Sequence, residues 1–153
     1  MSVAVGQPAP DFELRDQHGQ PWRLSDFRGK RNVVVVFYPF SFTRVCEGEL
    51  CELRDDITDF DKPDVELVAV SVDSSPVHRR WASEQRYTFP ILADFWPHGA
   101  VAQSYGVFDP KLGAARRATF IIDRDGIVRW STVNELREAR SLDDYRKALA
   151  DIG

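Results

Sequence analysis

Two strongly apolar runs predict the central strands of the fold. Val33–Tyr38 begins with four consecutive valines and carries no charge, and it predicts a strand over Asn32–Tyr38. Such a run, without polar alternation, is typical of a strand buried on both faces of a sheet. Val65–Val72 predicts a second strand. Between the two runs, apolar residues recur at helical spacing and predict an amphipathic helix from Thr43 to Phe60, with a stripe of Leu50, Leu53, Ile57 and Phe60.

Shorter patterns predict the other elements. Phe12–Leu14 and Trp22–Leu24 flank turn residues, so they predict an N-terminal β-hairpin. Residues 89–92 are expected to form a loop. The further elements expected are helices over Pro76–Tyr87, Ala100–Tyr105 and Leu142–Ile152, the last capped by Ser141, and a hairpin of Thr119–Ile122 with Ile127–Thr132 through Asp123–Gly126.

The order of these elements predicts the fold class. Strand, helix and strand followed by a hairpin and a helix imply an α/β protein with a mixed central sheet and flanking helices. This order matches a thioredoxin-like core with an additional N-terminal β-hairpin. A chain of this length is expected to form a single domain over residues 1–153.

Composition narrows the class of protein. The net charge of −4 at pH 7, with basic residues scattered along the chain, argues against nucleic acid as a partner. No apolar stretch approaches the roughly 20 residues that cross a bilayer, and the first residues lack a signal-peptide pattern. We therefore expect a cytoplasmic protein with no membrane partner. Two cysteines in such a protein indicate redox or catalytic work more than a structural disulfide.

Cys46 lies where a reactive sulfur is expected. With Thr43 as the N-cap, Cys46 takes the third position of the helix, at the N-terminal end of its apolar stripe. Unpaired backbone N–H groups and the positive end of the helix dipole favour a thiolate there. The alternative is that Cys46 is only a small, buried apolar side chain.

Cys51 follows five residues later and is predicted to face the polar side of the helix, beside Glu47, Arg54 and Asp55. In an intact helix, the Cα atoms of residues five apart lie roughly 8.7 Å from each other. A disulfide needs roughly 4.4–6.8 Å. Cys51 is therefore either a bystander or a partner that reaches Cys46 only when the first helical turns unwind.

A family resemblance rests on Pro39, Thr43 and Cys46, whose spacing resembles the active-site signature of the peroxiredoxins. The chain resembles that family in order along nearly its whole length. Its subgroup features are mixed: one stretch resembles alkyl hydroperoxide reductase E, whereas the cysteine spacing is similar to the bacterioferritin-comigratory (Q-type) peroxiredoxins. The segments that carry the resemblance are Ala9–Phe12, Ser71–Asp73, Asp94–Gly99, Tyr105–Val107 and Arg117–Phe120.

The resemblance implies a thiol peroxidase in which Cys46 attacks a hydroperoxide and becomes a sulfenic acid. It implies that Thr43 and the backbone N–H of Cys46 contact the peroxide, that Pro39 shields the pocket, and that Arg117 supplies positive charge. Glu49 is implied to position that arginine. Each has an ordinary alternative: Thr43 as a cap, Pro39 as a strand end, Arg117 as a solvated residue, and Glu49 as a carboxylate favoured by the helix dipole.

The expected partners also follow from the resemblance. They are hydroperoxide substrates, a reductant that is thioredoxin, a glutaredoxin-like protein or a low-molecular-weight thiol, and a second copy in a homodimer that uses the loops near Phe42 and Trp96. No cofactor is implied, and the histidines are too far apart in sequence for metal-ligand spacing. Two rivals stay open: a thioredoxin-fold thiol-disulfide oxidoreductase, which usually carries Cys-x-x-Cys, and a non-catalytic interaction module.

Overall fold

A mixed, five-stranded sheet forms the centre of the protein, as seen in a computed structural model that describes residues 2–60, 62–135 and 138–152. The strand order is β5-β4-β3-β8-β9. Three strands run parallel, and the last two are antiparallel to their neighbours. The strands are β3 (Asn32–Phe37), β4 (Val65–Ser71), β5 (Ile91–Ala93), β8 (Arg117–Ile122) and β9 (Val128–Asn134).

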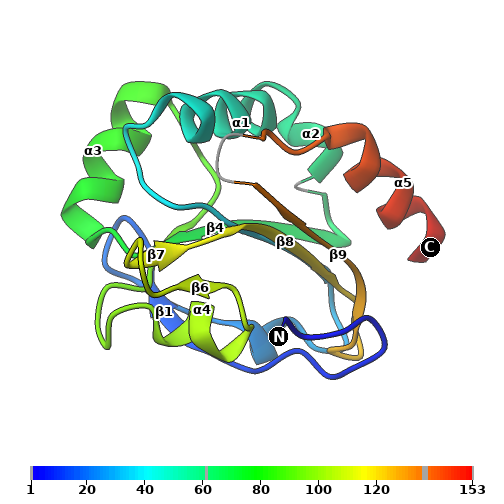
Figure 1. Ribbon diagram of the computed structural model, residues 1–153. Coiled ribbons are helices and arrows are strands. Elements are labelled where there is room, and N and C mark those ends of the chain that lie inside the picture. Colours follow the sequence, from blue (N-terminus) through cyan, green and yellow to red (C-terminus); the bar gives the residue numbers. More distant parts are fainter. Residues whose placement is uncertain (1, 61, 136–137, 153) are drawn as a thin grey trace.

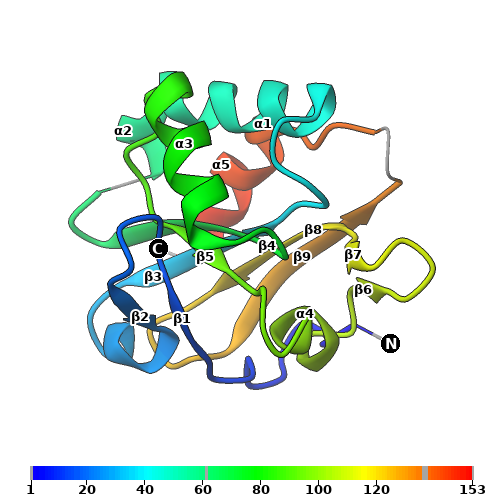
Figure 2. The ribbon, with the colours of Figure 1, turned by 90° about the vertical axis from the view of Figure 1, so that its left-hand side faces the viewer.

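One group of helices covers one face of the sheet, and the N-terminal segments together with residues 100–115 cover the other (Figures 1 and 2). The first layer holds α1 (Arg44–Asp55), α2 (Ile57–Phe60), α3 (Ser75–Gln85) and α5 (Leu142–Ile152). The second holds the hairpin of β1 (Glu13–Arg15) and β2 (Pro21–Arg23), the 3-10 turn η1 (Leu24–Phe27), and α4 (Ala100–Ser104) with the strand pair β6 (Phe108–Asp109) and β7 (Ala114–Ala115).

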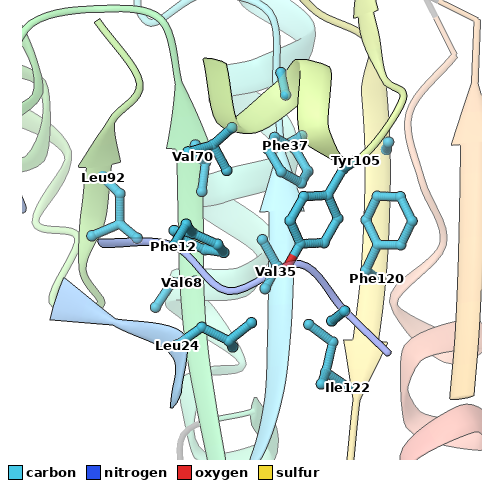
Figure 3. Packing of buried hydrophobic residues seen from close by; sticks show 14 of the residues in the cluster. Phe12, Leu24, Val35, Phe37, Val68, Val70, Leu92, Tyr105, Phe120 and Ile122 are labelled. Carbon is cyan, nitrogen blue, oxygen red and sulfur yellow. The ribbon is translucent and has the colours of Figure 1, made fainter. Parts of the chain in front are cut away.

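The alternation of side chains along each strand divides the core in two. Val34 and Val36 of β3 pack under the helices, whereas Val35 and Phe37 face the opposite layer. Figure 3 shows this second cluster, in which Val35 and Phe37 lie beside aromatic side chains from other elements, including Tyr105. Burying each of these large apolar side chains contributes about 1.5–3 kcal/mol.

The predicted fold class is confirmed, with local corrections. The single helix predicted over Thr43–Phe60 is wrong, because α1 ends at Asp55 and α2 follows as a short separate helix. Consecutive carboxylates at Asp55 and Asp56 meet the negative end of the helix dipole, which disfavours continuation.

The prediction of a loop over residues 89–92 is also wrong in part, since Ile91–Ala93 forms β5. This strand is too short to show a pattern of its own. It is held by β4 on one side and by Gln17 of the N-terminal hairpin, whose side chain donates to Phe89 O and accepts from Ile91 N. The strand predicted at Trp22–Leu24 lies one residue earlier, because Leu24 begins η1.

Topology brings the sequence-distant site residues together. Because β8 runs antiparallel to β3, its first residues pair with the last residues of β3, with Ala118 opposite Phe37. Arg117, at the start of β8, therefore lies where the chain leaves β3 to begin α1.

Across the ranges that the structure describes, we find no helix with the length and apolar character of a membrane span.

Candidate active site

The segment that joins β3 to α1 has a strained and well-packed backbone. Pro39 and Ser41 are buried, and Phe42 has a φ of 63°, in the left-handed region. That conformation costs a bulky residue about 1–2 kcal/mol. The ring of Phe42 packs on Trp81 of α3, with ring centroids 5.9 Å apart, although the residue stays 49% exposed. Packing against α3 helps to offset the strain.

Thr43 is the N-cap residue of α1, as predicted, but its hydroxyl does not cap the helix. Thr43 Oγ1 instead donates to Phe40 O at 2.7 Å. The hydroxyl is thus held by the loop, and the first-turn N–H groups have no side-chain cap from Thr43. Cys46 is the third residue of α1, and its side chain is fully buried, with 0% exposed.

Arg117 and Glu49 meet Cys46 beneath the first turns of α1. Arg117 Nη1 lies 3.4 Å from Cys46 Sγ and 2.5 Å from Glu49 Oε1. Arg117 and Glu49 are almost completely buried, at 2% and 5% exposure. Strand alternation explains why Arg117 and not Arg116 reaches the sulfur, since Arg117 belongs to the face of β8 that α1 covers.

Arg140, which sequence reasoning missed, completes this cluster. Its guanidinium binds both oxygens of Glu49, through Nε to Oε2 and Nη2 to Oε1, each at 2.8 Å. Its backbone N–H also donates to Glu49 Oε2. Arg140 Nη1 donates to Phe37 O and Ala118 O, so this side chain ties α1 to the ends of β3 and β8. No pattern in the polar stretch before α5 distinguishes Arg140 from its neighbours.

The two arginines of the cluster keep Glu49 ionised. Burial by itself raises the pKa of the Glu49 carboxyl, but hydrogen bonds and charge from Arg140, together with the charge of Arg117, lower that pKa below its ordinary value. Glu49 is therefore an anion between two buried cations. Buried charges are stable only when they are paired. A thiolate at Cys46 would place a second anion beside Arg117.

Cys51 lies apart from this cluster, on a side of α1 that is only partly open to solvent at this position. The residue is half-buried against α3, where its Sγ is 3.3 Å from Tyr87 Oη and 3.6 Å from Gln85 Oε1. The helical neighbours are polar as predicted, but α3 and the chain after it cover that side of α1. Both cysteines are free thiols, and α1 is intact between them.

The structure thus brings Arg117 into direct contact with both Cys46 and Glu49, and it places Pro39 and Thr43 on the segment that precedes α1. Cys51 stands on another side of the same helix. Within residues 2–60, 62–135 and 138–152, no group of three or more histidine, cysteine or acidic side chains is arranged to hold a metal ion. The site can therefore present one buried sulfur to a fixed guanidinium.

Known proteins share this sequence and fold. Residues 5–131 match the AhpC/TSA family. Alkyl hydroperoxide reductase E of Mycobacterium tuberculosis is 47% identical over 148 residues, which cover 97% of this chain and 97% of that protein. The chloroplastic 2-Cys peroxiredoxin BAS1 of Hordeum vulgare is 36% identical over 155 residues, which cover 95% of this chain and 73% of that protein.

Two solved structures have the same architecture. The reduced 2-Cys peroxiredoxin of Plasmodium vivax superposes with a TM-score of 0.88 at 29% identity, covering 98% of this chain and 82% of that one. Peroxidoxin BcpB of Mycobacterium tuberculosis superposes with a TM-score of 0.86 at 32% identity, covering 100% and 99%. Because sequence and structure match along nearly the whole chain, this protein belongs to the AhpC/TSA family, the peroxiredoxins.

Proposed function

We propose that this thiol-dependent peroxidase reduces hydrogen peroxide and organic hydroperoxides at Cys46. The observation that carries the proposal is the contact of 3.4 Å between Arg117 Nη1 and the buried Cys46 Sγ. A guanidinium cannot lose its proton at ordinary pH, so it is a permanent positive charge beside the sulfur. The name of the similar alkyl hydroperoxide reductase E supports the substrate class.

The chemistry is a two-electron transfer from sulfur to peroxide. The Cys46 thiolate attacks one peroxide oxygen, so an S–O bond forms while the O–O bond breaks. The departing oxygen takes a proton and leaves as water or an alcohol, and Cys46 becomes a sulfenic acid. Donors that meet the charge growing on the departing oxygen lower the barrier. We assign that role to the Cys46 N–H and to Arg117, which also orients the substrate. The Thr43 hydroxyl, whose hydrogen goes to Phe40 O, contacts the peroxide as an acceptor of its O–H.

The remaining site residues support this geometry. Pro39, buried at the end of β3, excludes water from the sulfur. Glu49 and Arg140 hold the guanidinium of Arg117 in place through their shared hydrogen bonds. Hydrogen peroxide is little larger than water, so small side-chain movements of the 40–43 segment admit it while the backbone geometry persists.

Cys51 is our candidate for the resolving thiol. It is the only other cysteine of the chain and lies on the same helix. Its attack on the Cys46 sulfenic acid forms an intramolecular disulfide and releases water, which requires the first turns of α1 to unwind. The reductant is thioredoxin, a glutaredoxin-like protein or a low-molecular-weight thiol. Such a cycle fits a reducing compartment, which is why we assign the protein to the cytoplasm.

A homodimer is part of the same proposal. Phe42 follows the carboxyl end of β3, and Phe95 and Trp96 follow that of β5, so these residues lie along one edge of the sheet. They are 49%, 52% and 80% exposed. Exposed aromatic residues of this kind are enriched at protein interfaces.

Single-turnover kinetics tests the proposed peroxidase. Reduced protein is mixed with hydrogen peroxide in a stopped-flow instrument, and oxidised products are located by mass spectrometry. Cys46→Ser should abolish the rapid phase, whereas Cys51→Ser should retain the first turnover and lose the intramolecular disulfide. Equal loss in both variants, or in neither, contradicts the assignment of Cys46. A persistent Cys46 sulfenic acid beside free Cys51 contradicts the resolving role alone.

A further inference from the structure

A buried polar cluster that the proposed chemistry does not use lies where β4 ends and α3 begins. It consists of Ser71, Asp73 and His78. Ser71 and His78 are fully buried, and the Asp73 side chain is 18% exposed. In Figure 2, α3 covers the part of the sheet next to β4 and β5. His78 belongs to this helix, Ser71 is the last residue of β4, and Asp73 lies between the two elements. The cluster contacts the active-site loop at Ser41, which is also buried.

Distances define a continuous chain of hydrogen bonds. The backbone N–H of Ser41 donates to Asp73 Oδ2 at 2.7 Å. Ser71 Oγ lies 2.7 Å from the same carboxylate oxygen and 2.6 Å from His78 Nε2. One oxygen of Asp73 therefore receives hydrogen bonds from two parts of the chain, the loop after β3 and the end of β4.

The number of hydrogens that each side chain can donate fixes the direction of these hydrogen bonds. A carboxylate only accepts, so the Ser71 hydroxyl donates its one hydrogen to Asp73. Ser71 Oγ must then accept from His78, and His78 carries its hydrogen on Nε2. Burial lowers the pKa of His78 to about 4, so the ring is neutral at pH 7 and has one N–H to give. Asp73 is thereby held in one orientation by a residue of α3.

The arrangement is not that of a hydrolytic triad. In a triad the carboxylate orients the imidazole, and the hydroxyl is open to substrate. Here the carboxylate contacts the hydroxyl, and Ser71 has no exposed surface. The cluster points to the loop backbone, so a positioning role accounts for its contacts.

We propose that Asp73, oriented by Ser71 and His78, is a positioning residue that latches the active-site loop through the Ser41 N–H. The inference rests on the proposed function, because the loop carries Thr43 and leads directly to Cys46. Phe42, next to Ser41, adopts an unfavourable left-handed φ of 63°, so this backbone needs external contacts to persist. The Asp73 bond supplies one, and the Tyr38 side chain, 2.9 Å from Ser41 Oγ, supplies another.

The latch sets the balance between two states of the site. With the loop closed, Thr43 and the start of α1 are positioned for the peroxide. With the loop open, the fully buried Cys46 becomes accessible to larger reagents and to a resolving thiol. Loss of one charge-assisted hydrogen bond should raise the open population about tenfold or more. Reaction with peroxide should not gain from that opening, since it needs the closed geometry.

The test compares Asp73→Asn with the protein that keeps Asp73. Both carry Cys51→Ser, so that Cys46 is the only thiol. Stopped-flow measurements give the rate constant for hydrogen peroxide, alkylation gives that for iodoacetamide, and NMR gives hydrogen exchange of the Ser41 amide. We expect exchange and alkylation to rise about tenfold, and the ratio of peroxide to alkylation rate constants to fall by the same factor or more. Glu84→Gln, on the exposed side of α3, is the matched control and should change none of the three.

A second variant covers the case in which Asp73→Asn does not fold. Ser71→Ala removes the bridge to His78 and leaves the Asp73 carboxylate, so it should shift exchange and the rate ratio in the same direction by a smaller factor. The latch is refuted if both rate constants change by one common factor, or if exchange at Ser41 stays within twofold in the folded variants. A slow reaction of the Cys51→Ser protein with peroxide would refute the peroxidase instead. Hydrogen exchange and alkylation would still test the latch in that case.

Discussion

His78 makes the stability of this protein depend on pH below neutrality. Burial lowers the pKa of its imidazole from the ordinary 6.5 to about 4, although the charge of Asp73 acts in the opposite direction. The ring has no exposed surface and packs against Tyr38. In the unfolded chain the imidazole takes up a proton near pH 6.5, whereas in the folded protein it stays neutral until about pH 4. Acid therefore favours the unfolded state through this residue.

The size of the effect follows from the two pKa values. Because folding lowers the pKa, the contribution of His78 to stability is complete above pH 6.5 and is lost as the pH falls through the folded value. One unit of pKa difference corresponds to about 1.4 kcal/mol. The free energy of unfolding should decrease through this group by about 2 kcal/mol at pH 5 and about 3 kcal/mol at pH 4.

Urea unfolding between pH 7 and pH 4, followed by tryptophan fluorescence, measures this contribution when the protein is compared with His78→Gln. Glutamine keeps an N–H donor for Ser71 but does not titrate, and all carboxylates are common to the two proteins. We expect the difference in unfolding free energy between them to move by about 3 kcal/mol in favour of the variant from pH 7 to pH 4. A difference that stays constant over this range would falsify the assignment of a buried, neutral imidazole.

Two further outcomes test the site and the assembly. Arg117→Lys keeps a positive charge but replaces the planar guanidinium, whose Nη1 contacts both Cys46 and Glu49, with an ammonium on a differently shaped side chain. The single-turnover rate constant with peroxide should therefore fall on the order of tenfold to a hundredfold. An equal fall in Arg116→Lys would contradict this. Trp96→Ser should convert the dimer to a monomer in sedimentation equilibrium. Val5→Ser, at an exposed position in the N-terminal segment, should leave the dimer intact. A monomeric starting protein would refute the dimer.

Local patterns in the sequence were sufficient for the fold and for the place of Cys46. Neighbouring residues encode the valine run, the apolar stripe of α1 and the turn before it. Rules of periodicity and capping therefore predict them. Thr43 illustrates the limit of such rules. Its N-cap position was predictable, but the choice of its hydroxyl between the helix and Phe40 O depends on the loop backbone, where Phe42 takes a positive φ.

Contacts between distant segments were beyond the sequence patterns. Arg140 meets Glu49 across 91 residues, and nothing near Arg140 in the chain indicates that it is buried. Cys51 shows the same limit. A helical wheel describes only the residues of α1, whereas Gln85 and Tyr87, which contact Cys51, belong to α3 and to the segment after it. The arginine beside the sulfur was reached by family resemblance and not by pattern, since Arg116 and Arg117 are equivalent by composition.

The charges of the buried cluster connect the chemistry to the movement that resolution requires. In the reduced enzyme of the proposed mechanism, the Cys46 thiolate and Glu49 balance Arg117 and Arg140, and each charge has a partner within hydrogen-bonding reach. Oxidation turns the thiolate into a neutral sulfenic acid, which removes the negative charge that lies beside Arg117. The attraction between Arg117 and Cys46 therefore weakens once the sulfenic acid has formed. The sulfur must move toward Cys51 only after this step. Reaction with peroxide thus prepares the opening that the Asp73 latch otherwise restrains.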